Sequence, residues 1–416
     1  MQKLKVFSAA FVVFSLLHIG AAKDLRTVTE PKNPEICTSL NATSDDDTQT
    51  IQKALDSCTK GQAVALLSNS TFYAGPLTIP SGVSLLVEEH AILRAIPNPK
   101  LYDKGANKCG TYDDYGGECK AFISILKANG SGIYGKGTID GQGGAYINSQ
   151  NVTWWEVSSA ARQHDKVPNN PPIIQINNSV DITLYQIVLR NAPLDHINSR
   201  KTTGLTVWKV TIYTPKASSS TDGIDMDGNQ NVTIAHTKIT TTSYTIVIRA
   251  SEAPSRHISA YNLHLNRAYG TAIGTNTKHG VSNVNFSNIT MTILTYGINI
   301  VTNSLNGGLV ANISYNNICM YRVRHPVHLD MFSPNITGNL KPQFMNIFLN
   351  KVQVGNSGDF VFHGIEKSNP IEVELHNTRV SKGSSWSVKN AIVTGDWKDD
   401  LNGRTHCPHN VNNLLE

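Results

Sequence analysis

The sequence is poor in charged and aromatic residues. Of its 416 residues, 16% are charged and 7% are aromatic, while 40% are hydrophobic. This composition is too apolar for a disordered chain, and it argues against an all-helical protein. The modest net charge of +5 gives no indication of nucleic-acid binding. Abundant Asn, Thr, Ser, Val and Ile instead favour β-strands joined by polar turns.

Long hydrophobic runs are absent after Ala22. The run from Val6 to Ile19 follows Lys3 and Lys5 and ends before Gly20-Ala21-Ala22. It is shorter than the roughly 20 residues that span a bilayer, and its flanks are typical of a secretory signal peptide. We therefore predict a signal peptide over residues 1–22, no membrane anchor, an extracellular protein and a single domain over residues 23–416.

The sequence has no Cys-x-x-Cys motif and no Cys/His spacing typical of zinc, so we expect neither a metal nor a cofactor. An even number of cysteines in a secreted chain predicts disulfides. Sequence proximity favours Cys37 with Cys58 and Cys109 with Cys119, which leaves Cys319 to pair with Cys407. Ten Asn-x-Ser/Thr sequons suit a glycoprotein, although asparagine beside a strand also favours turns.

One helix is expected near the start of the mature chain, over residues 48–58. Asp47 is placed to cap it, and Ile51, Ala54, Leu55 and Cys58 recur on one helical face. We expect this helix to cover the open edge of the first coil, because an uncovered edge invites association with other strands.

A repeat dominates the rest of the chain. Short segments that alternate apolar and polar residues begin at Val180, Leu205, Val232, Ile258, Val284 and Ile313. Their period of about 26 suits one coil of a parallel β-helix, whereas a propeller needs about 40 residues per blade. In such a solenoid, residues one period apart stack into columns at about 4.8 Å.

Six motifs then occur in order, and together they resemble the polygalacturonases of glycoside hydrolase family 28. They are Asp46-Asp47-Thr48, Gly75-Pro76-Leu77, Ser81-Gly82-Val83, Gly137-Thr138-Ile139-Asp140-Gly141-Gln142-Gly143, Thr221-Asp222-Gly223-Ile224-Asp225 and Pro326-Val327-x-Leu329-Asp330. The resemblance covers residues 45–335 and implies a right-handed parallel β-helix that acts on pectin.

The resemblance also implies inverting hydrolysis, in which one carboxyl group protonates the leaving oxygen and another activates water. In the family these groups come from an Asn-Thr-Asp motif and from the adjacent aspartates of a later Gly-Asp-Asp motif, helped by a histidine and an Arg/Lys pair. Asp222 is retained here. Ser243 and Tyr244 stand where the family has the adjacent aspartates, and Tyr269 stands where it has the histidine. Asn299 and Val301 stand where it has the Arg/Lys pair. The sequence therefore predicts a glycosidase site without its acid or its uronate-binding cations.

Other residues are candidates for the same cleft. Asp195 precedes Asp222 by about one coil, and either neighbours it or caps a turn. His196 either faces a ligand or has a structural role. Trp154-Trp155 either stacks on a sugar or packs internally. Lone basic residues of a solenoid are more often solvated, but five could instead form a basic strip for a polyanion: Arg249, His279, Arg322, Arg324 and His325.

Three hypotheses follow. The first is a secreted, catalytically inactive polygalacturonase-like monomer that binds pectic polysaccharide or oligogalacturonide, a pectinase, or a polygalacturonase-inhibiting protein. The second is an active pectinase with a rearranged site around Asp222 and Asp195, and the third is a purely structural solenoid. An assay of hydrolysis separates the first two, because an inactive protein releases no reducing ends.

Overall fold

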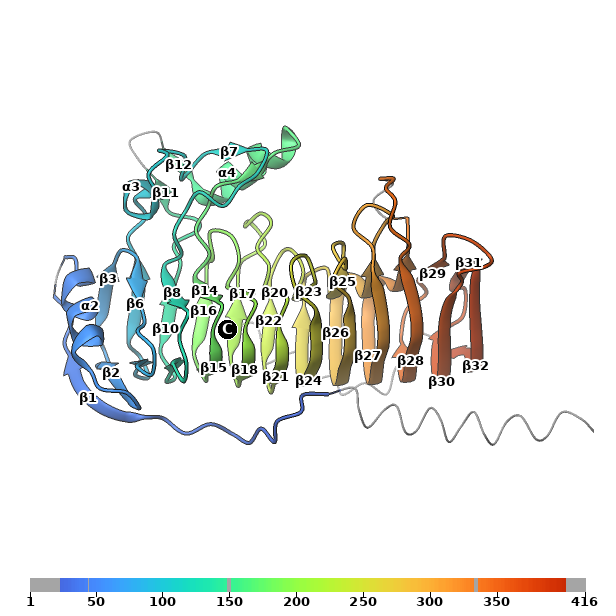
Figure 1. Ribbon diagram of the computed structural model, residues 1–416, viewed down its shortest axis with the longest axis horizontal. Coiled ribbons are helices and arrows are strands. Elements are labelled where there is room, and N and C mark those ends of the chain that lie inside the picture. Colours follow the sequence, from blue (N-terminus) through green and yellow to red (C-terminus); the bar gives the residue numbers. More distant parts are fainter. Residues whose placement is uncertain (1–22, 44, 148–150, 333–335, 402–416) are drawn as a thin grey trace, which may run out of the picture.

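The computed structural model describes residues 23–43, 45–147, 151–332 and 336–401 (Figure 1). Successive coils stack along the long axis of the molecule, and 28 strands form one sheet whose strand pairs run parallel. The fold predicted from the repeat, a parallel β-helix, is therefore confirmed. No helix in the described ranges is long and apolar enough to cross a membrane.

The strands of the solenoid line three faces, and the face that carries the candidate site is called the site face here. Its short strands are β4 (Leu77–Thr78), β8 (Ile123–Leu126), β14 (Ile174–Asn177), β17 (Ile197–Arg200), β20 (Ile224–Asp227), β23 (Ile246–Arg249), β25 (Thr271–Gly274), β29 (Asp359–His363) and β31 (Ser385–Lys389). Each of these strands pairs in parallel with a neighbour one coil away.

The other two faces are built in the same way. The second face contains β1 (Glu35–Leu40), β2 (Gln62–Leu66), β5 (Ser84–Val87), β9 (Gly132–Tyr134), β15 (Val180–Tyr185), β18 (Thr203–Trp208) and β21 (Gln230–Ala235). The third contains β3 (Thr71–Ala74), β6 (Ile92–Ala95), β10 (Thr138–Asp140), β16 (Val188–Arg190), β19 (Thr211–Tyr213) and β22 (Lys238–Thr240).

Longer strands continue from one face to the next in the C-terminal half. They are β24 (Ser255–Asn266), β26 (Val281–Val301), β27 (Leu309–Asp330), β28 (Gln343–Val354), β30 (Ile371–Ser381) and β32 (Ala391–Leu401). The C-terminal ends of β26 and β27 pair with β25 and β29, so these ends belong to the site face.

The corner between the second and third faces explains both the repeat and the asparagine content. One residue at this corner adopts a left-handed conformation in successive coils, with φ between 54° and 62°, at Gln186, Lys209, His236, Asn262, Asn288 and Asn317. Asparagine tolerates this conformation better than most residues. Sequon asparagines Asn69, Asn231, Asn288 and Asn312 also adopt positive φ, which gives them a structural role independent of glycosylation.

The core is a set of aliphatic columns inside the coils. Ile197, Ile224 and Ile246 are paired in register on consecutive coils and are fully buried. The same hydrophobic cluster continues from Ile51 to Val380. Stacking of like aliphatic residues fixes the register of the coils, because a slip of one residue exchanges inward and outward side chains.

Helix α2 (Thr48–Ser57) confirms the predicted helix, and it lies at the N-terminal end of the solenoid (Figure 1). Ile51 and Leu55 are its buried residues. The predicted cap was wrong, because the Asp47 side chain makes no cap bond and instead accepts hydrogen bonds from the backbone N–H groups of Thr43 and Tyr73. The amide of Thr48 donates to Asp46 instead.

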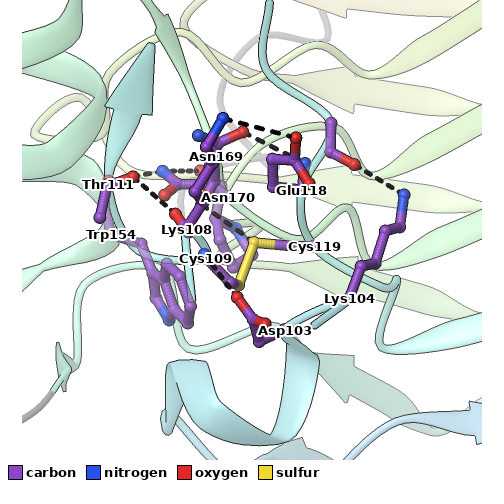
Figure 2. The surroundings of a disulfide bond; sticks show 12 residues. Asp103, Lys104, Lys108, Cys109, Thr111, Glu118, Cys119, Trp154, Asn169 and Asn170 are labelled. Atoms are coloured by element: carbon purple, nitrogen blue, oxygen red, sulfur yellow. Dashed lines mark hydrogen bonds and ion pairs between the residues drawn. A yellow bond between two sulfur atoms is a disulfide. The ribbon is translucent and has the colours of Figure 1, made fainter. Parts of the chain in front are cut away.

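Two of the three predicted disulfides are confirmed, Cys37–Cys58 and Cys109–Cys119. Figure 2 shows the second, where the Asp103 carboxylate accepts a hydrogen bond from the backbone N–H of Cys109 at 3.0 Å. The third predicted bridge joins Cys319 to Cys407, and Cys407 lies outside the described residues. Residues 1–22, the predicted signal peptide, also lie outside them.

An insertion that sequence patterns did not predict rises from the N-terminal half of the solenoid (Figure 1). It contains α3 (Pro99–Tyr102), β7 (Tyr112–Asp113), β11 (Tyr146–Ile147), β12 (Val152–Thr153), α4 (Trp154–Gln163) and β13 (Val167–Pro168). Thr153 and Glu156 form a capping box that starts α4. The Cys109–Cys119 bridge closes a loop of this insertion.

The tryptophan pair of the insertion packs against protein groups. Trp154 is buried with its ring edge-on to Tyr102, and the Trp155 indole donates a hydrogen bond to the Ala192 carbonyl at 2.9 Å. Arg162 donates to the Ser219 hydroxyl. These contacts fix the insertion against the loops that lead into β17 and β20.

The first described residues form a strap along the outside of the solenoid (Figure 1). The Asp24 amide donates to the Ser259 hydroxyl, and the Thr233 hydroxyl donates to the Asp24 carboxylate at 2.8 Å. Arg26 pairs with Asp24 at 2.8 Å and donates to a backbone carbonyl of β18. The strap therefore ties together β18, β21 and β24, which lie on consecutive coils.

Replacing Asp24 with alanine is expected to lower the free energy of unfolding by about 1 to 3 kcal/mol, because buried partners lose a charged hydrogen-bond acceptor. Urea denaturation measures the change. Asp181→Asn is the matched control, since Asp181 lies 3.7 Å from Arg26 but is 61% exposed, and asparagine tolerates its left-handed backbone conformation. Loss of its charge is therefore expected to change stability by less than about 0.5 kcal/mol. Equal effects of the two substitutions would contradict a specific role of Asp24.

Candidate functional site

The register of the site face aligns six residues into a column. Each lies two positions before one of the paired residues Ile197, Ile224, Ile246, Thr271, Ile298 and Val327. In chain order they are Asp195, Asp222, Tyr244, Tyr269, Tyr296 and His325. This site column begins with two carboxylates and continues with four aromatic rings.

Asp222 is held by the residues that follow it one coil later. Its Oδ1 accepts a hydrogen bond from the backbone N–H of Tyr244 at 2.9 Å, and its Oδ2 lies 3.9 Å from a terminal nitrogen of Arg249. A hydrogen bond from the Ser243 side chain also favours its charged form. Burial, followed by the charge of Asp225, nevertheless raises the pKa of Asp222 to about 6.

Asp195 lies next to Asp222 in the column and is buried. Its Oδ2 accepts a hydrogen bond from the Asn198 side chain at 2.8 Å. Burial raises the pKa of Asp195 to about 8, and the charges of Asp222 and Asp225 act in the same direction. The structure therefore brings together Asp195 and Asp222, and burial beside these charges favours the protonated form of Asp195.

Arg249 supplies positive charge to this cluster. Its Nε lies 3.1 Å from Asp225, and its side chain is 29% exposed. Burial opposes the charge of the guanidinium, but Asp225 and Asp222 outweigh that effect and raise the pKa of Arg249. Arg249 is thus paired with protein carboxylates and not presented as a free cation.

His196 lies beneath the column and is fully buried. Its Nδ1 is 2.9 Å from the Asp222 carbonyl and its Nε2 is 2.7 Å from the Thr214 hydroxyl. Because a carbonyl only accepts, Nδ1 carries the proton and Nε2 accepts from Thr214. Burial lowers the pKa of His196 to about 4, so a neutral ring holds the backbone of Asp222 in place.

The aromatic part of the column, Tyr244, Tyr269, Tyr296 and His325, is called the aromatic ladder. Consecutive ring centroids lie 5.4, 6.2 and 5.0 Å apart. The first two contacts are tilted or edge-on and the last is stacked. Tyr269 is 37% exposed. Burial raises the pKa of Tyr244 to about 12, so its hydroxyl stays protonated at neutral pH.

A polar chain runs beside the ladder and includes Asn299. The Asn299 amide donates to the Tyr244 hydroxyl at 3.1 Å, and its carbonyl oxygen lies 2.8 Å from Nδ1 of His328. Burial lowers the pKa of His328. Val301 is nearly buried and is in register with Asp330 on the next coil. Neither Asn299 nor Val301 offers a cation at this position.

A hollow of about 310 Å³ lies at the C-terminal end of the ladder. Its lining consists of Tyr296, His325, His328, Asp359, Phe360, Val361, Ser385 and Ser387. Most of these residues escaped the sequence-based predictions. One signal was present, because Tyr244, Tyr269, Tyr296 and His325 recur at intervals close to the strand repeat.

The basic strip, which was the alternative to solvated single residues, is not assembled in the described residues. His279, Arg322 and Arg324 are exposed, but none belongs to the site column or lines the hollow. Of the five basic residues considered, His325 contributes its ring to the ladder. Within the described ranges, no group of three or more His, Cys, Asp or Glu residues is arranged to hold a metal ion.

Known proteins share both the sequence pattern and the fold of this chain. The sequence profile of the glycosyl hydrolases family 28 matches residues 49–396. An endo-polygalacturonase of Pectobacterium parmentieri is 38% identical over 394 residues, which cover 94% of this chain and 98% of that protein. The solved polygalacturonase of Erwinia carotovora ssp. carotovora is 37% identical, with a TM-score of 0.85 over 89% of this chain and 100% of that one.

Proposed function

Because the chain belongs to family 28 of the glycosyl hydrolases, we propose that it is a polygalacturonase-like protein that binds pectic polysaccharide without hydrolysing it. One observation carries the proposal. The coil after Asp222 presents Tyr244 to the site column, where the resemblance to family 28 places a second carboxyl group for inverting hydrolysis.

Tyrosine is a poor substitute for that carboxyl group. With its pKa raised to about 12, Tyr244 is neither a base at neutral pH nor an acid of suitable strength. Its backbone amide also engages Asp222, and Arg249 and Ser243 approach the same carboxylate. These contacts support a structural task for the one family carboxylate that the sequence retains.

Loss of a general acid or base costs about 10² to 10⁴ in rate. We therefore expect reducing-end release from polygalacturonate to be at least about 10² below that of an active family member, with the protein retarded in native gels that contain pectic polymer. Turnover that disappears in Asp222→Ala would overturn the proposal. Absence of retardation would instead favour a structural solenoid or a protein partner, such as a pectinase or an inhibitor of one.

A second candidate is an active pectinase with a rearranged site, and the pKa values of Asp195 and Asp222 favour it. Two neighbouring carboxyls with pKa values raised to about 8 and about 6 form the kind of pair that divides acid and base roles. In this alternative Asp195 donates the proton and Asp222 activates water. Assays on several pectic polymers with Asp195→Asn and Asp222→Asn test it, because both substitutions must abolish any turnover.

We also propose that the protein is secreted. The two disulfides in the described residues suit an oxidising compartment. The N-terminal sequence suits export, and the strap begins directly after the predicted cleavage site. N-terminal sequencing of protein from the culture medium tests the proposal, with Lys23 as the expected first residue.

A further inference from the structure

We propose that the hollow beside Ser387 and the adjoining aromatic ladder bind a sugar chain that carries no free carboxylates, and that this chain is methyl-esterified galacturonan. The inference rests on the proposed binding function and names its ligand. Its basis is the combination of ring faces, hydroxyl partners and charge around the hollow.

The shape of the site suits a pyranose. The hollow has a volume of about 310 Å³, at the lower end of the range for small-ligand pockets. Tyr296 and His325 form one side of it, with rings stacked at 5.0 Å. The ladder continues from Tyr296 to the exposed ring of Tyr269 on the preceding coil. Aromatic rings bind the apolar faces of sugars through the same dispersion and area terms that stabilise aromatic contacts in proteins.

Polar groups that line the hollow can bind sugar hydroxyls. The Asp359 carboxylate accepts from the Ser385 hydroxyl at 2.6 Å and is 53% exposed. A carboxylate has about four acceptor sites, so it retains capacity for hydroxyl donors of a ligand. Ser387 lies 2.8 Å from Nε2 of His363 and also lines the hollow. The arrangement thus combines ring faces with a few hydrogen-bonding groups.

The charge around the hollow disfavours a uronate. Asp359 is negative, and burial lowers the pKa values of both His325 and His328, which are therefore neutral at pH 7. Arg324 does not line the hollow, and the Lys389 ammonium lies over the Phe332 ring. A free carboxylate would therefore meet Asp359 without a cation among the lining residues. A methyl ester removes that charge and keeps the sugar otherwise unchanged.

Isothermal titration of the secreted, full-length mature chain at pH 7 tests the inference. The ligands are polygalacturonate oligomers, the same oligomers after complete methyl esterification, and a neutral galactan of similar length. We expect the esterified oligomers to bind at least tenfold more tightly than the free acids. Tyr296→Ala and Tyr269→Ala are each expected to weaken that binding about tenfold.

The controls separate a binding role from a folding role. Tyr213 is a similarly exposed tyrosine on β19, away from the site face, so Tyr213→Ala should leave binding unchanged. Ser385→Lys places a cation at the hollow and should raise affinity for the free acid several-fold, without a comparable gain for the ester. Unfolding curves identify variants that lose their fold, and the exposed position of Tyr269 makes its variant the safer one.

Each outcome decides between the proposals. Equal or tighter binding of polygalacturonate would overturn the inference, and so would a preference for galactan. In either case the proposed function, binding of a pectic polymer, would still hold for the polymer that binds. Unchanged affinity in both tyrosine variants would remove the ladder from the site and refute the inference. If none of the polymers binds, the proposed function fails and the inference fails with it.

Discussion

Replacing Arg249 with methionine is expected to lower the free energy of unfolding at pH 7 by about 3 to 5 kcal/mol. Arg249 lies 3.1 Å from Asp225 and 3.9 Å from Asp222, and its charge also acts on Asp195. Its removal leaves clustered, buried carboxyls without this compensating charge. Breaking a buried pair by removing one partner is costly for that reason.

Urea denaturation at pH 7 and pH 5 measures the effect. The loss should be smaller at pH 5, because Asp195 and Asp222 are then protonated to a greater extent and need the cation less. Arg256→Met is the matched control, since the exposed Arg256 contacts Gln230 and belongs to no carboxylate cluster among the described residues. Unchanged stability together with lost binding of polygalacturonate would show that Arg249 serves a ligand instead.

The fold could be predicted because its cause is local and repeated. Alternation within each strand and the regular spacing of the strands follow from coils that stack Ile197 on Ile224 and Ile246. The insertion with α4 has no such repeat, and its position depends on single contacts such as Trp155 with Ala192. Periodic patterns in the sequence therefore did not indicate it.

The site was only partly accessible from sequence. The resemblance to family 28 placed Asp222, Tyr244 and Tyr269 in one site, and the strand register aligns them in one column. The spacing of residues along the chain does not reveal how deeply a side chain is buried. The raised pKa of Asp195, which burial causes, therefore became apparent only from the structure. The repeated segments recognised in the sequence end with the one at Ile313, whereas the hollow depends on β29 and β31, so the repeat did not indicate it.

Asp195 is expected to make the protein less stable as the pH rises from 6.5 to 8. Its pKa is raised from an ordinary value of about 4 to about 8 in the folded protein, so the folded state binds a proton that the unfolded state has lost. Its contribution to stability is complete below the unfolded pKa and is lost as pH rises through the folded pKa. The slope approaches about 1.4 kcal/mol per pH unit, which gives a loss of about 2 kcal/mol over this window.

The window is chosen to isolate Asp195. The pKa of His196 is lowered to about 4, so His196 destabilises the fold only below its unfolded value of about 6.5. Asp222, with its pKa raised to about 6, has largely completed its change by pH 6.5. Titration of these two neighbours therefore contributes little between pH 6.5 and 8.

Asp195→Asn should abolish this pH dependence. The amide keeps the size of the side chain and still accepts the hydrogen bond from Asn198, but it cannot ionise. Urea denaturation at pH 6.5, 7.2 and 8 should give nearly constant stability for the variant and a falling value for the native chain. Asp181→Asn, at an exposed position, should retain the native slope.

The same variant bears on function. A carboxyl group that keeps its proton at neutral pH at a stability cost is typical of a site selected for chemistry or binding. If Asp195→Asn is more stable at pH 8 and binds pectic oligomers unchanged, the raised pKa is a consequence of burial beside Asp222. If a pectic polymer is hydrolysed and the variant loses that turnover, Asp195 is the acid of a rearranged site. An equal pH slope in the native and variant proteins would show that Asp195 is ionised throughout this range.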